Sequence, residues 1–334
     1  MMEDLSKEIA LSEDLENWMT NLPPKLRTIP LIYLAIPGSH DSMTSSITTS
    51  SKLAPDAENF LQQMKFLGPL LRFIMARWSK TQDYDMLEQL KAGIRYFDLR
   101  VATKKGSVYP YFVHGLYATE VVSVLNDLKK FLDSHPGEVV ILDFNHFYAL
   151  EKIDHNNFLR LLNATFNQKL TPYSHNMQHL TLEYFSKFRY QVIIVYRSDM
   201  ARFQQPNLWP SASFPSPWPQ TVSKRELITK LDEGIAGRPN NTSFISQFVL
   251  TPTNWFVTKH LFSTLRKQCA KPLTKVIQNW IQKQKVGVGG VNIIICDFID
   301  INDYEFTKEI VSLNAKALFN EFMYNAPSLT PVDK

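Results

Sequence analysis

Short runs of apolar residues alternate along the chain with longer segments in which apolar residues recur every three or four positions. The short runs predict buried strands, because near-continuous Val, Ile and Leu is typical of strands covered on both faces. The longer segments predict amphipathic helices, several of them ended by glycine or proline. Strands are expected at 31–36, 94–101, 109–113, 139–144, 191–196, 243–250 and 291–297, with a weak eighth position inside 206–220. Helices are expected at 12–21, 57–78, 85–92, 119–134, 153–168, 223–236, 256–268, 272–284 and 303–316.

Seven clear strands with mostly helical connections indicate an α/β protein with a parallel sheet covered on both sides. No linker divides the 334 residues, so a single distorted (β/α)8 barrel of the TIM type accounts for the length. We expect a lead-in with a short helix over 1–24, the barrel over 25–320 and a tail over 321–334. A doubly wound open sheet is the alternative. A dinucleotide-binding form of that sheet is disfavoured, because the glycine cluster at 287–290 precedes a strand, whereas a dinucleotide loop follows one.

Composition narrows the class of protein. Hydrophobic residues make up 44% of the chain and aromatic residues 12%, enough for a packed core. The net charge of +4 suits an anionic lipid surface, but no dense Lys/Arg run indicates a nucleic-acid partner. No secretory signal is visible, and no stretch reaches the roughly 18 apolar residues that span a bilayer. Two cysteines, Cys269 and Cys296, fit reduced structural thiols. We therefore expect a cytoplasmic protein.

Polar side chains follow the ends of six predicted strands, the first of them delivered by an expected Pro37-Gly38 turn. Each residue alone has a structural explanation, such as a capping imidazole or a local Asp–Arg pair. Because the C-terminal ends of barrel strands share one mouth, we expect the side chains to lie together and form a site. These candidate residues are His40, Asp41, Asp98, Arg100, His114, Asn145, Arg197 and Asp297.

Two imidazoles with carboxylates and an arginine suit phosphodiester cleavage by acid/base catalysis. One imidazole would deprotonate a hydroxyl nucleophile and the other would protonate the departing alkoxide. A neighbouring carboxylate fixes the tautomer of each ring, and an arginine fork binds the phosphoryl oxygens. A hard cation such as calcium wants several carboxylates together. Arg100 stands where a further carboxylate would be needed, so no metal cofactor is expected.

Four motifs resemble the X domain of phosphatidylinositol-specific phospholipase C, in that family's order and approximate spacing. The resemblance covers about residues 25–320 and is greatest to small animal proteins that contain only this barrel. It implies attack of the inositol 2-hydroxyl on phosphorus, with release of diacylglycerol, and hence a phosphoric diester hydrolase of lipid catabolism and signalling. The motifs are Pro37–Ser42, Gly93–Arg100, Val113–Gly115 and Glu138–Phe144.

The resemblance also implies roles for the residues of the expected site. His40 would be the general base with Asp297 as its partner, and His114 the general acid. Arg100 would bind the phosphate, and Asp41 and Asp98 would orient the site. Asn145 and Arg197 would contact the substrate, Arg197 through an inositol hydroxyl. Calcium-dependent members have acidic ligands at the positions of Arg100 and Asn145, which favours the metal-free form.

Two departures leave alternatives open. Bacterial members have Lys where Asn145 stands, and their Asp/Tyr inositol contact has no match in 206–220. A catalytically weak barrel that binds phosphoinositides or a protein is therefore the alternative function. A glycerophosphodiesterase is a further alternative, but it would need a metal and a Glu-rich barrel mouth, which is absent from this sequence.

The partner would be phosphatidylinositol or a phosphoinositide in a membrane surface, reached by peripheral association. Two segments could meet that surface. The 57–78 helix carries basic residues beside its apolar ones, and the 206–220 loop presents aromatic residues between prolines. The residues concerned are Phe73, Ile74, Met75, Trp78, Lys65, Arg72 and Arg77 in the first segment, and Trp209, Phe214 and Trp218 in the second.

Overall fold

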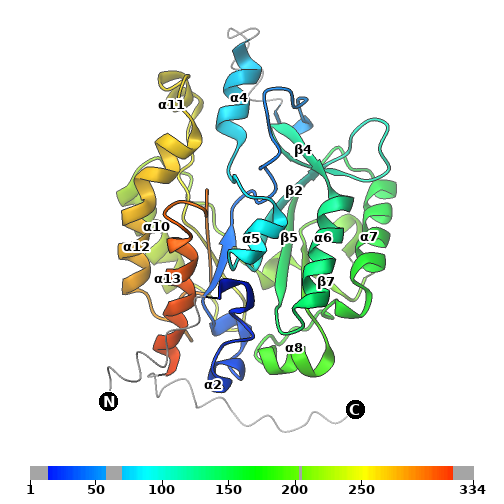
Figure 1. The fold of residues 1–334 in the computed structure, drawn as a ribbon, viewed down its shortest axis with the longest axis vertical. Helices are drawn as coiled ribbons and strands as arrows, with labels where there is room; N and C mark the ends of the chain where they lie inside the picture. Colours follow the sequence, from blue (N-terminus) through cyan, green and yellow to red (C-terminus); the bar gives the residue numbers. More distant parts are fainter. Residues whose placement is uncertain (1–13, 58–69, 203–204, 319–334) are drawn as a thin grey trace.

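The computed structural model describes residues 14–57, 70–202 and 205–318 (Figure 1). Its strands are β1 (Ile36–Ser39), β2 (Tyr96–Ala102), β3 (Tyr111–His114), β4 (Leu116–Glu120), β5 (Val140–Tyr148), β6 (Val192–Tyr196), β7 (Leu208–Trp209), β8 (Ile245–Gln247) and β9 (Ile293–Cys296). Its α-helices are α2 (Pro24–Arg27), α4 (Leu71–Ser79), α5 (Met86–Lys91), α6 (Val121–Ser134), α7 (Lys152–Phe166), α8 (Leu182–Phe188), α9 (Asp199–Arg202), α10 (Lys224–Ala236), α11 (Asn254–Lys259), α12 (Thr274–Lys283) and α13 (Glu305–Leu313).

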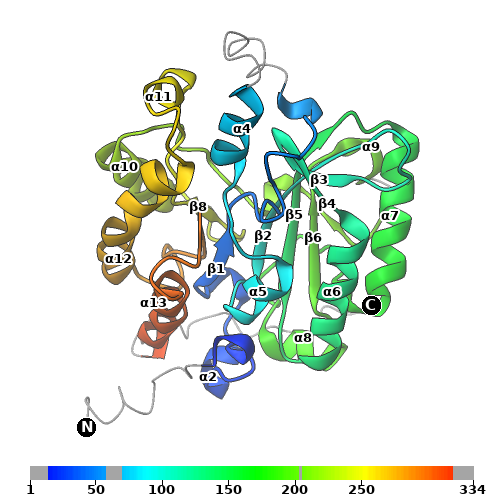
Figure 2. The ribbon, with the colours of Figure 1, turned by 45° about the horizontal axis from the view of Figure 1, so that its top comes forward.

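The strands form a curled sheet with the order β7-β6-β5-β2-β1-β9-β8, and every neighbouring pair on this path is parallel. Helices lie outside it, with α10, α12 and α13 on one side and α5, α6 and α7 on the other (Figures 1 and 2). The segment after β7 bridges the two edge strands, because Ser243 N–H donates to Ser213 O and Ile245 N–H to Pro215 O. The predicted distorted barrel is confirmed. The weak eighth strand predicted inside 206–220 corresponds to β7 and the segment that follows it.

The predicted strand at 109–113 is not a barrel strand. Residues Tyr111–His114 form β3, which pairs antiparallel with the end of β2 and turns directly into β4. This is possible because β2 and β5 extend beyond the ring of the barrel, with a bulge between Leu99 and Arg100. The β3–β4 hairpin therefore stands on the rim, where a further pair of strands has free backbone groups to bind.

The first strand begins later than predicted and runs through the Pro37-Gly38 pair, where a turn was expected. Residues Leu31–Tyr33 form a 3-10 turn, and β1 runs through Pro37 and Gly38 to Ser39. Gly38 is required by packing, since a Cβ there would lie 2.8 Å from Ile295 Cγ2 and 2.9 Å from Tyr96 Cδ1. The Pro-Gly pair is thus part of the strand, and the chain turns only after His40.

Several predicted helices are shorter than expected. Where 12–21 was expected to be helical, the described part is a 3-10 turn over Leu15–Asn17, capped by Asp14; Ser12 lies outside the described residues. The 57–78 segment is helical at α4, and 58–69 lies outside the described residues, as does the predicted tail over 321–334. The single helix expected at 256–268 is divided into α11 and a π-helical turn, Arg266–Ala270.

A buried ion pair at the bottom of the barrel explains two of the motif residues. Arg95 and Glu138 are both fully buried, with Arg95 Nε donating to Glu138 Oε2 at 2.9 Å. Arg95 also donates to three backbone carbonyls, and Glu138 accepts from the backbone and hydroxyl of Thr20. Because every group is paired, the charges are tolerated without water. The pair holds the lead-in segment against β2 and has a structural role.

Candidate functional site

The loop after β1 is fixed on three sides. His40 N–H donates to Cys296 O of β9, and Ser42 N–H donates to Asp98 O of β2. Gln82 Nε2 donates to the carbonyls of both His40 and Cys296. Asp41 adopts a positive φ of 39°, and its N–H donates to Asp98 Oδ2 at 3.1 Å. A side chain in that backbone region is disfavoured, so the surrounding hydrogen bonds hold His40 and Asp41 in one arrangement.

The His40 ring lies among three carboxylates. Its Nδ1 is 2.7 Å from Asp297 Oδ1, while its Nε2 is 3.4 Å from Asp41 Oδ2 and 3.8 Å from Asp98 Oδ2. Burial opposes protonation of the ring, but Asp41, Asp297 and Asp98 outweigh burial and raise the pKa of His40 to about 9. Since Asp297 accepts from Nδ1, Nε2 is the nitrogen that faces the site and exchanges the proton.

Asp41 lies between the two imidazoles. Its Oδ2 is 3.4 Å from His40 Nε2 and 3.3 Å from His114 Nε2, while its Oδ1 is 2.5 Å from Arg100 Nε. Burial would raise the pKa of Asp41, but Arg100 and both histidines lower it to about 2. Asp41 is therefore ionised and joins both rings and the guanidinium in one cluster.

His114 reaches this cluster from the β3–β4 hairpin rather than from a barrel strand. Its Nδ1 is 2.8 Å from the carbonyl of Ser79, at the end of α4. A carbonyl only accepts, so Nδ1 carries a hydrogen and Nε2 is the nitrogen that faces Asp41. The next residue, Gly115, has a φ of +67°, and a Cβ there would lie 3.0 Å from Ser79 Oγ. Glycine thus allows the close approach that sets the ring against Ser79.

The two predicted substrate contacts already have partners. Asn145 Nδ2 donates to Asp98 Oδ1, and His146 Nδ1 lies 2.8 Å from Asn145 Oδ1. Arg197 binds the buried Asp143 through two parallel hydrogen bonds of 2.8 and 2.7 Å and also donates to Phe214 O. Burial raises the pKa of Asp143 against the opposing effect of Arg197. Contact of either side chain with a substrate stays a prediction.

A cavity of about 320 Å³ opens in front of the histidines. His40, Arg100, His114 and Asp297 line it, whereas Asn145 and Arg197 do not. Its far wall is apolar and comes from α4 and from the region of α11, including Met75, Trp78, Leu250 and Val257. The structure thus brings six of the eight predicted residues into one cluster around His40 and places this cavity on the His114 side of it.

The sequence did not indicate several of the lining residues as site residues, among them Asp56, Ser79, Tyr148 and Trp218. Tyr148 lies beyond Asn145 on the part of β5 that continues past the predicted strand end at 144, so nothing in the sequence signalled it. Trp218 was assigned to a membrane contact, yet its ring lies 5.3 Å from the His40 ring. Asp56 and Ser79 lie outside every strand end, so no pattern indicated them.

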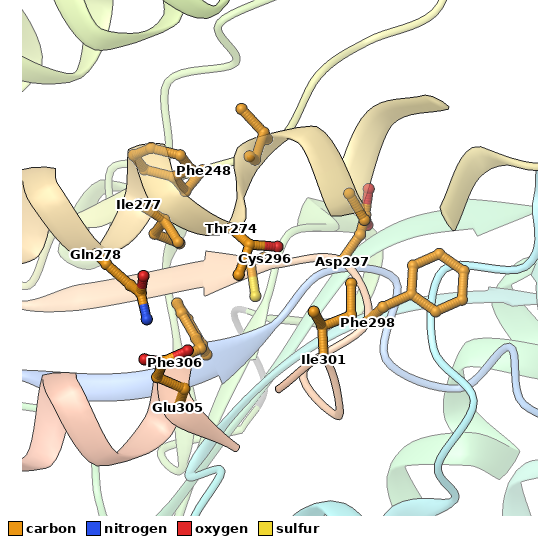
Figure 3. Close-up of a pocket in the computed structure, with 12 residues that line it drawn as sticks. Phe248, Thr274, Ile277, Gln278, Cys296, Asp297, Phe298, Ile301, Glu305 and Phe306 are labelled. Atoms are coloured by element: carbon orange, nitrogen blue, oxygen red, sulfur yellow. The ribbon is translucent and has the colours of Figure 1, made fainter. Parts of the chain in front are cut away.

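A second, smaller cavity lies behind Asp297 (Figure 3). Mostly apolar side chains from α12, β9 and α13 line it, among them Ile277, Cys296 and Phe306. Its volume of about 30 Å³ has room for about one water molecule, too little for a substrate. Burial raises the pKa of the Cys296 thiol well above its ordinary value, which makes it unreactive.

Three of the clustered residues could offer ligands to a metal ion. One atom each of His40, Asp41 and Asp98 lies within 4.8 Å of the others. The Arg100 guanidinium, however, contacts Asp41 Oδ1 at 2.5 Å, and a divalent cation would have to compete with this fixed positive charge. The donor set therefore fits an arginine-neutralised site better than a hard-cation site.

Comparison with known proteins identifies relatives of this chain. The family model "Phosphatidylinositol-specific phospholipase C, X domain" matches residues 74–198. The chain is 37% identical over 304 residues to PI-PLC X domain-containing protein 3 of Homo sapiens, covering 90% of this chain and 94% of that protein. It is 33% identical over 311 residues to PI-PLC X domain-containing protein 1 of Homo sapiens, covering 91% of this chain and 94% of that protein.

Solved structures show the same fold. A mutant of the phosphatidylinositol-specific phospholipase C from Staphylococcus aureus superimposes with a TM-score of 0.63 at 18% identity, over 91% of this chain and 98% of that one. The corresponding enzyme from Listeria monocytogenes gives a TM-score of 0.62 at 18% identity, over 90% and 98%. Because two animal relatives are 37% and 33% identical to this chain over 90% and 91% of its length, the chain belongs to the family of PI-PLC X domain-containing proteins.

Proposed function

We propose that the protein is a phospholipase C that cleaves the phosphodiester between inositol and diacylglycerol, without a metal. The observation that carries the proposal is the pair of imidazole Nε2 atoms, His40 at 3.4 Å and His114 at 3.3 Å from one oxygen of Asp41. An acid and a base on either side of a shared carboxylate, beside an arginine, suit in-line displacement at phosphorus.

The steps follow from the atoms that face the cavity. His40 Nε2 takes the proton of the inositol 2-hydroxyl, whose oxygen forms the new bond to phosphorus. The bond from phosphorus to the glycerol oxygen breaks, and that oxygen receives a proton from His114 Nε2. Arg100 neutralises charge on the phosphoryl oxygens, and Asp297 stabilises the imidazolium that forms at His40. The products are a cyclic inositol phosphate and diacylglycerol.

Independence from metal is the first test. We expect the purified protein to cleave phosphatidylinositol in vesicles at the same rate with and without a chelator of divalent cations, because Arg100 supplies the positive charge beside Asp41. Release of a water-soluble inositol phosphate is the measurement. Loss of activity with the chelator, restored by calcium, would contradict the metal-free site.

A catalytically weak barrel that binds phosphoinositides remains the second candidate, and two observations favour it. Asn145 and Arg197 are bound to Asp98 and Asp143, and the pKa of His40 of about 9 leaves little free base at neutral pH. Binding of inositol lipids without turnover at pH 9, where half of His40 is deprotonated, would favour this candidate over the enzyme.

The structure corrects the predicted membrane contact. Trp209 and Phe214 are fully buried, as are Ile74 and Met75 of α4, so their substitution would test folding. Trp218, 40% exposed, covers His40. Of the residues that the sequence predicts to contact the membrane, Phe73 is an exposed aromatic side chain on α4. Lys65 lies outside the described residues.

A different pair of aromatic side chains projects from α11 and the segment after it, and two other residues of α11, Asn254 and Val257, line the cavity. Trp255 of α11 is 67% exposed and Phe262 is 72% exposed. Arg77 of α4 donates to the carbonyls of Phe262 and Ser263, which ties the two elements together at the same end of the molecule (Figures 1 and 2). Lys259 lies 4.9 Å from the Trp255 ring. Aromatic and basic groups together suit an anionic membrane surface, and among the described residues no helix is long and apolar enough to cross one.

The double variant Trp255→Ala/Phe262→Ala should bind phosphatidylinositol-containing vesicles at least about tenfold more weakly. Burial of each exposed ring in the interface contributes roughly 1.5–3 kcal/mol to the free energy of binding. Co-sedimentation with vesicles measures binding. Cleavage of a soluble inositol phosphodiester should be unchanged. Ile153→Ala on α7, which is also an exposed apolar residue, is the matched control. Vesicle binding equal to that of the control would remove these residues from the membrane contact.

A further inference from the structure

The backbone hydrogen bonds between β1 and β9 stop beside His40 and Asp297. The last of them runs from His40 N–H to Cys296 O at 3.1 Å. In a parallel pair of strands, the next bond would run from Phe298 N–H to His40 O. Phe298 N–H instead donates to Thr81 O at 2.7 Å, and the backbone turns away at Phe298 with a φ of 52°. The carbonyl of His40 thus lacks the partner that a longer β9 would supply.

The side chain of Gln82 takes the place of the missing bond. Its Nε2 donates to His40 O at 3.0 Å and to Cys296 O at 2.9 Å, and its Oε1 accepts from Ile299 N–H at 3.2 Å. Gln82 is fully buried, and these bonds use both hydrogens and the oxygen of its amide. This amide bridge therefore joins the end of β1 to the backbone before and after Asp297.

The amide bridge bears on the His40 ring through its carboxylate partner. Asp297 Oδ1 lies 2.7 Å from His40 Nδ1, and so short a contact depends on the spacing of the two backbones that carry the side chains. Three other charged side chains contact the ring, and they come from the loop after β1 and from β2: Asp41, Asp98 and Arg100. Of these four contacts, the one with Asp297 joins β1 to β9, across the gap that the amide bridge spans.

We infer that Gln82 is a positioning residue for the proposed base: its amide replaces the next bond between β1 and β9 and so holds the His40 ring against Asp297. The part that this pair plays in catalysis rests on the proposed function, whereas its geometry can be tested without turnover. Gln82 does not line the cavity in front of the histidines. It can still limit kcat, because a displacement of about 1 Å in a reacting group can cost about 10²-fold in rate.

The substitution Gln82→Met removes the amide bridge and nearly keeps the volume of the side chain. Gln191→Met is the matched control, since Gln191 is a buried amide that directly precedes β6, at the end of the barrel opposite the site. Its Nε2 donates to the carbonyls of His135 and Glu138, and its Oε1 accepts from Lys169. Each variant therefore loses an amide with two backbone acceptors, and Gln82→Met alone affects the pair at the site.

The first measurement is the pKa of His40 in the free protein, followed by NMR of labelled imidazoles and assigned with His40→Ala. We expect this pKa, about 9 in the wild type, to fall by about 0.5 or more in Gln82→Met, because a carboxylate that moves away favours the charged ring less. It should be unchanged in Gln191→Met. The second measurement is turnover of phosphatidylinositol. Gln82→Met should lower kcat about tenfold or more with KM nearly unchanged, and Gln191→Met should change neither.

An unchanged pKa of His40 in folded Gln82→Met would overturn the inference, as would an equal fall in Gln191→Met. Should Gln82→Met not fold, Gln82→Asn keeps an amide that is one methylene too short to bridge the two strands, and the same results are expected of it. If the wild type cleaves no inositol lipid and the pKa of His40 still falls in Gln82→Met alone, the proposed function fails and the positioning of the pair by Gln82 stands.

Discussion

Replacing His40 or His114 with alanine should lower the turnover of phosphatidylinositol by about 10²–10⁴-fold, the range in which a positioned acid or base contributes. Each ring presents one nitrogen to the cavity, and its other nitrogen is held by Asp297 or by the carbonyl of Ser79. Neither Asp41 nor Arg100 can replace these nitrogens: Asp41, whose pKa is lowered to about 2, has no proton to donate and is a weak base, and Arg100 keeps its proton. The rate of inositol phosphate release at pH 9 is the measurement.

The two histidines can be told apart by the leaving group. A nitrophenyl group leaves without a proton, so with an inositol phosphate ester of that kind His114→Ala should recover most of the wild-type rate. His40→Ala should stay inactive, because the 2-hydroxyl still needs a base. His175→Ala, a change at an exposed histidine, is the control. Equal recovery of both variants would contradict the assigned roles, and thermal unfolding would show whether either variant is misfolded.

The second large effect concerns Asp297. We expect Asp297→Asn to lower kcat/KM by about 10²–10⁴-fold at the pH optimum, by analogy with the loss when a triad carboxylate is replaced by its amide. The amide can still accept from His40 Nδ1–H, but it gives no charge to stabilise the imidazolium. The pH profile separates this role from a structural one.

The pH dependence of activity follows from the protonation states that a general base and a general acid need. His40 must be unprotonated and His114 protonated, so the pH profile of kcat/KM should be bell-shaped, with one limb near pH 9, the pKa of His40. Removing the charge of Asp297 should move this limb to lower pH. The same shift has a stability consequence: the raised pKa of His40 favours the fold fully below about 6.5, and this contribution is lost as the pH rises through about 9. An unchanged limb in Asp297→Asn would contradict the pairing.

The barrel could be predicted because its buried strands and amphipathic helices differ in period, and periodicity survives in a single sequence. The β3 strand could not be told from a barrel strand, since an apolar run does not specify a parallel or an antiparallel partner. The Pro37-Gly38 pair indicated a turn by composition. Gly38 is instead required by close packing against Tyr96 and Ile295, which are distant in the sequence.

The site was predictable where residues follow strand ends and unpredictable where the contact depends on loops. His40 and Asp297 directly follow β1 and β9, and Asp98 lies on β2 beside β1, so the pairing of these three strands brings the residues together. Trp209 and Trp218 look alike in a Pro-rich segment, yet Trp209 lies on the edge strand β7 and is fully buried, whereas Trp218 covers His40. The pattern of prolines and aromatic residues does not distinguish the two tryptophans, because their burial depends on which side of the segment faces the barrel.

The hairpin that carries His114 makes site assembly separable from folding. His40 is fixed by strands within the ring, whereas His114 depends on two pairs of residues between β2 and β3 and on its contact with Ser79. Opening of the hairpin would remove the acid and expose Phe112 while the parallel strands of the barrel stay paired, because stability differs between parts of one domain. A melting curve or a circular dichroism spectrum would not report that loss. Amide hydrogen exchange across 111–120 would, and it offers a way to ask whether an inactive preparation is unfolded or has only lost its acid.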